Sequence, residues 1–134
     1  MAEERAQRRL AAILAADVVG YSRMMGANET GTLTALKALD KDILQPLMTK
    51  HSGRVVKLMG DGVLAEFASA VNAVECAVEM QKSMAANNKD APEEQKIILR
   101  IGINLGDVIV DGGDLYGDGV NVAARLEEIG RAHV

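Results

Sequence analysis

The stretch VVKLMGDGVLAEF, residues 55–67, contains two short apolar runs separated by Gly60-Asp61-Gly62. An Asp-Gly pair between apolar runs is the strongest short-range signal for a β-hairpin. The stretch therefore predicts two antiparallel strands, one from Arg54 to Met59 and one from Val63 to Phe67.

The chain begins with a charged segment followed by an apolar one. Residues 1–9 are expected to be a frayed or helical lead-in. Leu10 to Val19 is short, apolar and β-branched at its end, which is typical of a buried strand, and Gly20 is expected to end it.

A helix is predicted between this strand and the hairpin. From Thr30 to Met48, leucine and isoleucine recur at three- and four-residue steps, so one face of the helix is apolar. Asn28 or Thr30 is expected to cap its start. Pro46 lacks a backbone N–H, so a bend or a break is expected near it.

A second helix and a second strand pair are predicted after the hairpin. Ser69 is expected to cap a helix that runs to about Asn88, and the polar segment 87–94 reads as a loop. Two strands, 97–105 and 108–110, are expected around a turn at Gly106-Asp107. A glycine-rich loop, 112–119, then leads into a third helix from about Val120. The predicted apolar side of the second helix consists of Val71, Val74, Ala77, Val78 and Met80.

The predicted order of elements is β-α-β-β-α-β-β-α. This is the α+β, ferredoxin-like βαββαβ arrangement with an extra hairpin, an antiparallel sheet with helices packed on one face. At 134 residues the chain is expected to form one domain.

Composition excludes several classes of function. Aromatic residues make up 2% of the chain and the formal net charge is −4, so neither base stacking nor a basic phosphate-binding surface is expected, and nucleic acid is excluded as a partner. The apolar run 10–16 is too short to span a membrane. The lone Cys76 excludes an internal disulfide framework and favours a reducing, cytoplasmic location. Its Ala/Val-rich surroundings predict a buried structural thiol.

Two carboxylates stand out at the ends of apolar strands. Asp17 ends the first predicted strand and Asp61 lies at the tip of the hairpin. In a ferredoxin-like sheet these two elements are neighbours, so the two carboxylates are expected to converge as hard oxygen ligands of Mg²⁺ or Mn²⁺. Backbone N–H groups of Gly20-Tyr21-Ser22 are then available to phosphates. A strand-end residue and plain turn chemistry remain the alternative interpretations of the two carboxylates.

Three further polar residues interrupt apolar patterns. Lys57 lies within an apolar strand, where an edge or solvent-facing position is the alternative interpretation. Asn121 and Arg125, four residues apart, share one face of the third predicted helix. An ordinary surface position is the alternative for this pair.

Taken together, these segments resemble a known family. LAADVVGYSRMM (14–25), VVKLMGDGVLAEF (55–67) and LRIGINLGDVIVDGGDLYGDGVNVAARLE (99–127) are similar to the catalytic domain of class III nucleotide cyclases of bacterial type. The resemblance covers residues 10–127, nearly the whole chain.

The resemblance implies a site and a reaction. It implies that Asp17 and Asp61, with the Val18 carbonyl, bind two divalent cations. Lys57 and Asp114 match the pair that reads adenine, and Asn121 and Arg125 match the residues that position the ribose and stabilise the transition state. The implied reaction is attack of the ribose 3′ oxygen on the α-phosphate of ATP, giving cyclic AMP and pyrophosphate in signal transduction.

The resemblance also implies a head-to-tail homodimer with shared sites. Asp17 and Asp61 would come from one chain and the other four residues from its partner, and a C₂ interface supplies two such sites. The competing hypotheses are a guanylate cyclase and a non-catalytic, truncated or regulatory, cyclase-homology module that signals by dimerising.

The sequence departs from the family pattern at three places. Asp107 stands where some members carry a phosphate-binding arginine. GGDL, residues 112–115, superficially resembles the diguanylate cyclase signature, but that family has no place for Asn121 and Arg125. The chain also stops before the family's last strands, and the tail 128–134 is expected to be non-native, as in a truncated gene fragment.

Overall fold

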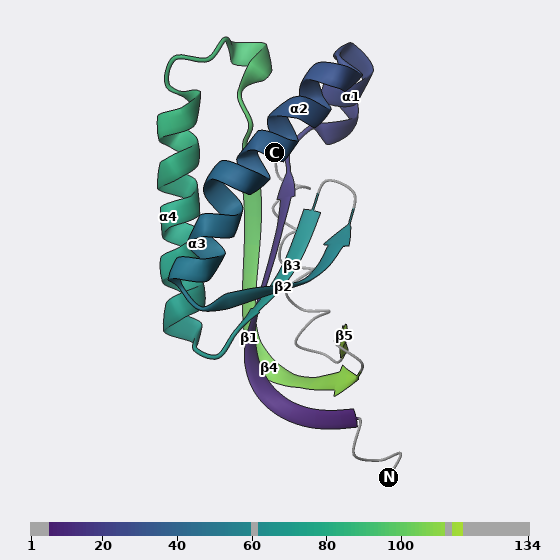
Figure 1. The fold of residues 1–134 in the computed structure, drawn as a ribbon, viewed down its shortest axis with the longest axis vertical. Helices are drawn as coiled ribbons and strands as arrows, with labels where there is room; N and C mark the ends of the chain where they lie inside the picture. Colours follow the sequence, from purple (N-terminus) through teal and green to yellow (C-terminus); the bar gives the residue numbers. More distant parts are fainter. Residues whose placement is uncertain (1–5, 60–61, 112–113, 117–134) are drawn as a thin grey trace.

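The computed structural model describes residues 6–59, 62–111 and 114–116. They form a sheet in the order β2-β3-β1-β4-β5, and every neighbouring pair is antiparallel (Figure 1). The first strand, β1, is therefore central and lies between β3 and β4. This order confirms the predicted ferredoxin-like sheet. The strands are β1 (Ala6–Val18), β2 (Gly53–Met59), β3 (Gly62–Phe67), β4 (Leu99–Asp111) and β5 (Asp114–Tyr116).

The predicted helix 30–48 is a chain of shorter helical segments. Asn28 caps its start, because its side chain accepts a hydrogen bond from the N–H of Gly31 at 2.9 Å. A π-helical turn precedes Pro46, which stands in the first turn of the next helix. The bend or break expected near Pro46 takes the form of this π-helical turn, and the backbone stays helical through it. The segments are α1 (Tyr21–Ala27), which the sequence did not predict, α2 (Glu29–Leu39), η2 (Asp40–Leu44) and α3 (Gln45–Lys50).

The helix after the hairpin, α4 (Ala70–Asn88), has the predicted bounds. The Ser69 hydroxyl caps it by accepting from the N–H groups of Val71 and Asn72. Its predicted apolar side is wrong in part, because the valines at 71, 74 and 78 are 46–63% exposed. The face that packs on the sheet is instead lined by smaller and sulfur-containing side chains, namely Ala73, Cys76, Met80 and Met84.

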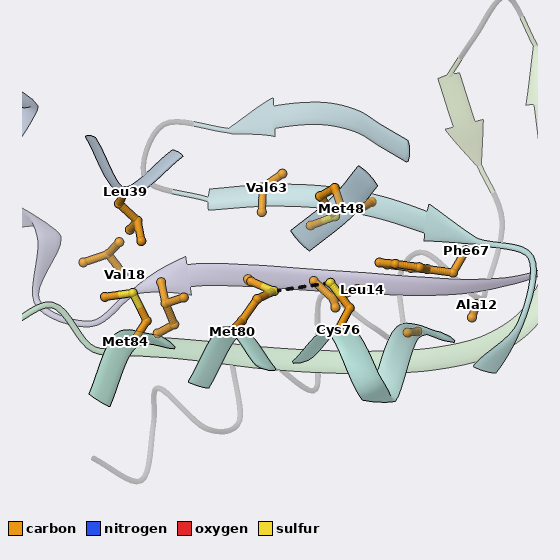
Figure 2. Close-up of a cluster of buried hydrophobic side chains, with 14 of the residues drawn as sticks. Ala12, Leu14, Val18, Leu39, Met48, Val63, Phe67, Cys76, Met80 and Met84 are labelled. Atoms are coloured by element: carbon orange, nitrogen blue, oxygen red, sulfur yellow. Dashed lines mark hydrogen bonds between the residues drawn. The ribbon is translucent and has the colours of Figure 1, made fainter. Parts of the chain in front are cut away.

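The main hydrophobic core fills the space between this face of α4, the segments α2 to α3 and one face of the sheet. We call that face of the sheet the helix face. Cys76 is fully buried there, as predicted, with its Sγ 3.9 Å from Met80 Sδ (Figure 2). Burial, with a smaller contribution from the negative charge of Glu79, raises the pKa of the Cys76 thiol to about 11. Cys76 is therefore a structural residue. Alternate residues of β1 and β3 supply the sheet side of this core, namely Ala12, Leu14, Ala16, Val18, Val63, Ala65 and Phe67.

The other residues of the same strands form a second apolar cluster on the opposite side, which we call the second face. Side chains alternate between the two sides of a strand, so one strand supplies both clusters. Val56 of β2 packs against this cluster. Its buried members are Ala11, Ile13, Ala15 and Leu64.

Two predictions about the sheet are wrong. Ala6–Arg9 are not a helical or frayed lead-in, since β1 begins at Ala6 and pairs with β4 from there. β4 also runs without a turn through Gly106 and Asp107, because these residues pair with Ala11 and Leu10 of the long β1. β4 instead pairs beyond this point with β5, where Asp111 lies opposite Asp114.

The short segment η3 (Glu93–Gln95) connects α4 to β4. The remainder of the predicted loop 112–119, the third predicted helix and the tail 128–134 lie outside the described residues. Within the part of the chain that is described, no helix combines the length and apolar character needed to cross a membrane.

Candidate functional site

Asp17 is the second-last residue of the central strand β1. Its Cα is paired with that of Gly62 in β3 and with that of Arg100 in β4. Asp17 is only 5% exposed, and a buried carboxylate is costly unless other groups compensate its charge. Arg100, on the paired position of β4, places a cation next to this carboxylate. Asp17 therefore lies at the end of a strand, as predicted from the sequence.

The expected proximity of the first strand and the hairpin is confirmed by the same register. Gly62 is the first residue of β3 and directly follows Asp61 in the chain. Asp61 itself lies outside the described residues, and within those described no group of three His, Cys, Asp or Glu side chains suits a metal ion. The residue next to Asp61 is nevertheless a direct neighbour of Asp17.

The segment after β1 turns sharply into α1. Gly20 has φ +71°, a left-handed conformation that side chains other than glycine rarely adopt. This turn starts α1 at Tyr21, and the first N–H groups of a helix have no partner within the helix. The predicted phosphate-binding segment, Gly20-Tyr21-Ser22, is thus a helix start. Val18 buries its side chain in the core, so only its backbone remains as the predicted metal ligand.

A pocket of about 270 Å³ reaches Asp17 from the helix side of the sheet. Its walls are largely apolar, so it suits an apolar group better than a triphosphate. Leucines of α2 and sheet residues make up much of its wall, among them Leu33, Leu36, Leu39, Val63 and Leu99.

Lys57 lies in the edge strand β2 and is exposed. It is paired with Leu64 of the second cluster, so its side chain belongs to the second face of the sheet. Asp17 continues the alternation of Ala11, Ile13 and Ala15 and belongs to the same face. Lys57 is paired through Leu64 with Ala15, and Asp17 lies two residues after Ala15 in β1. Two strand spacings and two residues along a strand correspond to about 12 Å in a regular sheet.

Asp114 begins β5, at the other end of the strand order from β2. The two edge strands nevertheless approach each other to within 8 Å between Cα atoms. Figure 1 shows why, since β1 and β4 bend together at the end of the sheet where β5 lies. The bend brings the strands that carry Lys57 and Asp114 close together across the sheet.

Asn121 and Arg125 lie outside the described residues. Asp107 lies within β4 opposite Leu10, so it is part of a regular ladder and not of a turn. The roles predicted for Asn121 and Arg125 stay predictions.

Two charged residues on the second face were not among the predicted site residues. Arg100 is the cross-strand partner of Asp17, and its Nε is buried with no hydrogen-bond partner among the described residues. Glu66 is 6% exposed and accepts a hydrogen bond of 2.8 Å from Nε of Arg54 on β2. Each is a charge within an apolar strand, the same signal that singled out Asp17 and Lys57.

Comparison with known proteins identifies relatives of the chain. Residues 4–134 match the family described as the adenylate and guanylate cyclase catalytic domain. A Rhizobium meliloti (strain 1021) protein named "Putative adenylate cyclase 3" is 60% identical over 129 residues, which are 96% of this chain and 22% of the relative. A Streptomyces coelicolor protein named "Adenylate cyclase" is 36% identical over 127 residues, covering 95% of this chain and 32% of that protein. The chain therefore spans less than a third of the length of these relatives.

A solved structure supports the same relationship. The crystal structure of an adenylate/guanylate cyclase/hydrolase from Silicibacter pomeroyi matches with a TM-score of 0.87 and 48% sequence identity. The match covers 92% of this chain and 72% of that one. The sheet and the described helices are thus shared with a protein of that description.

Proposed function

The chain belongs to the adenylate and guanylate cyclase catalytic domain family, and on that premise we propose that it is an adenylate cyclase. The proposed reaction converts ATP to cyclic AMP and pyrophosphate in cyclic-nucleotide signalling. The observation that carries the proposal is the register that pairs Asp17 with Gly62, the residue after Asp61. Two relatives, 60% and 36% identical, bear names that include adenylate cyclase, which supports ATP over GTP.

Asp17 and Asp61, with the Val18 carbonyl, are the proposed ligands of two Mg²⁺ or Mn²⁺ ions. Asp17 fits this role because it is a buried carboxylate at a strand end beside the residue that follows Asp61. Hard oxygen donors of this kind suit these cations, which keep further positions for phosphates. When bound, such ions lower the pKa of the ribose 3′ hydroxyl and neutralise the leaving pyrophosphate.

The other proposed residues bind and orient the nucleotide. Lys57 would donate to N1 of adenine and Asp114 would accept from its amino group, and the approach of β2 to β5 supports this pairing. Asn121 would position the ribose, and Arg125 would place its cation at the charge that develops on the α-phosphate. N–H groups of Gly20, Tyr21 and Ser22 would receive the phosphates.

We propose that two copies of the chain pair head to tail in the cytoplasm. One copy would contribute Asp17 and Asp61, and its partner would contribute the base, ribose and transition-state residues. An isologous C₂ interface makes two equivalent sites from one sequence. The presence of the whole residue set in one chain supports a homodimer.

A product assay tests the proposal. The protein, expressed with its native flanking sequence, is incubated with ATP or GTP and Mg²⁺ or Mn²⁺, and cyclic nucleotides are separated and quantified. Cyclic AMP is expected as the main product. Preferential formation of cyclic GMP would make the protein a guanylate cyclase, and no cyclic product from either nucleotide would favour a non-catalytic module.

A further inference from the structure

Strand β2 contains one more residue than the part of β3 with which it pairs. Val55 is paired with Ala65 and Lys57 with the adjacent Leu64, so Val56 is an extra residue, a β-bulge. Bulges bend a strand, increase its twist and re-aim side chains, and they are frequent next to active sites. Lys57 follows this bulge directly.

The residues before the bulge hold one register of the hairpin. Gly53 lies opposite Phe67, and any side chain at that position would clash with the Phe67 ring. Arg54 lies opposite Glu66, and the two side chains are hydrogen-bonded. A regular ladder extended back from Lys57 would instead place Arg54 opposite Phe67, where its charge and bulk do not fit. The pairs before the bulge and the pairs after it therefore differ in register by one residue, and the extra residue Val56 accommodates the difference.

The bulge is also held from the second face. The Val56 side chain packs against the cluster that includes Ile13 and Leu64. Its neighbour Val55 is 39% exposed, so the contacts of β2 with the sheet at this point come chiefly from Val56. Figure 1 shows β2 curving strongly along its length, and β2 approaches β5 to within 8 Å between Cα atoms.

We propose that Val56 is a positioning residue that aims Lys57 toward β5 and thereby sets the choice of base. This inference rests on the proposed cyclase function, in which Lys57 and Asp114 hydrogen-bond the adenine. Deleting Val56 leaves the pairs on both sides of it compatible with one regular ladder, so the hairpin retains its strand pairs and loses the bend together with the contacts of Val56. A misplacement of about 1 Å at a reacting complex can cost about a hundredfold in rate.

The test compares a Val56 deletion and Val56→Ala with Ile13→Val, which thins the same cluster without changing β2. The kcat/KM values for ATP and GTP are measured on the protein with its native flanking sequence. The deletion is expected to lower the ATP-to-GTP ratio by at least about tenfold, Val56→Ala to lower it less, and Ile13→Val to leave it unchanged. An equal loss for both nucleotides in the Val56 variants would mean that Val56 is merely structural and would overturn the proposal.

A second readout does not depend on turnover. A carbodiimide joins a lysine directly to a nearby carboxylate, and mass spectrometry quantifies the Lys57–Asp114 linkage. The yield is expected to fall several-fold in the deletion variant and to stay constant in Ile13→Val. If the deletion variant does not fold, Val56→Ala carries the test. An unchanged yield in folded Val56 variants would overturn the positioning role even if the protein proves to be no cyclase, whereas a wild-type protein without turnover contradicts only the proposed function.

Discussion

Asp17 in β1 lies directly opposite Gly62 in β3, one residue from Asp61, although the two pairing positions are 45 residues apart in the chain. Strand pairing brings their Cα atoms to about 5 Å. The central strand and the start of the second hairpin strand thus meet at the place where we propose that Asp17 and Asp61 form one site.

Asp17→Asn is expected to abolish cyclic AMP formation while leaving the fold intact, because the change removes a charge and little volume. Activity and thermal unfolding are measured in parallel, with Asp42→Asn, at an exposed position on η2, as the control that retains activity. More than a few per cent of residual turnover in Asp17→Asn would contradict its assignment as a metal ligand.

Mixing two inactive variants tests the shared site. Asp17→Asn chains and Arg125→Ala chains together form heterodimers in which one of two sites has every residue intact, so activity per heterodimer is expected to return to about half of the wild-type value. The mixture is assayed after the heterodimer has been isolated with two different tags. An isolated heterodimer without activity would indicate sites built within one chain.

Replacing Lys57 by Glu and Asp114 by Ser is expected to weaken the use of ATP and relatively favour GTP. Guanine presents a protonated N1 and an O6 acceptor, so in the wild-type protein donor faces donor and acceptor faces acceptor. Each unpaired buried group costs about 1–3 kcal/mol, which predicts a wild-type preference for ATP of about a hundredfold or more. Equal kcat/KM values for ATP and GTP in the wild type would exclude a base-reading role for the two residues.

Gly53→Ala is expected to destabilise the protein by about 1–3 kcal/mol, because the new methyl group meets the Phe67 ring in the core. Gly26→Ala is the matched control, since a Cβ there has no atom within 4 Å and alanine is preferred in a helix by up to about 1 kcal/mol. Urea unfolding of both variants measures the difference. Equal stability of the two variants would show that β2 shifts freely against β3.

The pH dependence of stability reports on Glu79 of α4. A hydrogen bond from Lys50 of α3, at 2.9 Å, is the main cause that lowers the pKa of Glu79 below its ordinary value of 4.5, and His51 contributes. A lowered pKa means that this contribution to stability is present above pH 4.5 and is lost as the pH falls through the folded-state pKa. The free energy of unfolding, measured with urea between pH 6 and pH 3, is expected to fall less steeply with decreasing pH in Glu79→Gln than in the wild-type protein. Identical pH profiles for both proteins would show that Glu79 makes no such contribution to stability.

Local chemistry in the sequence was sufficient for much of the fold. The Asp-Gly pair at 61–62 predicted the β2–β3 hairpin, and the Ser69 cap predicted the start of α4. Asp17 and Lys57 were identified because each places a charge in an apolar strand. These signals are carried by residues a few positions apart, so they can be read without knowing what the chain contacts elsewhere.

Other features depend on partners distant in sequence. α4 carries two apolar stripes, and only contact with the sheet decided that Cys76 and Met80 are buried while Val71, Val74 and Val78 face outward. Gly106-Asp107 has the composition of a turn, but pairing with the long β1 keeps it extended. Burial and hydrogen bonding against another element outweigh local propensity in both cases.

The sequence by itself predicted the candidate site residues, and it correctly placed Asp17 at the end of one strand and Lys57 within another. Only the tertiary structure decided that Arg100 stands opposite Asp17, that Val56 is an extra residue and that β2 approaches β5. The reason is physical, since register and sheet curvature arise from pairing and packing between strands that lie far apart along the chain.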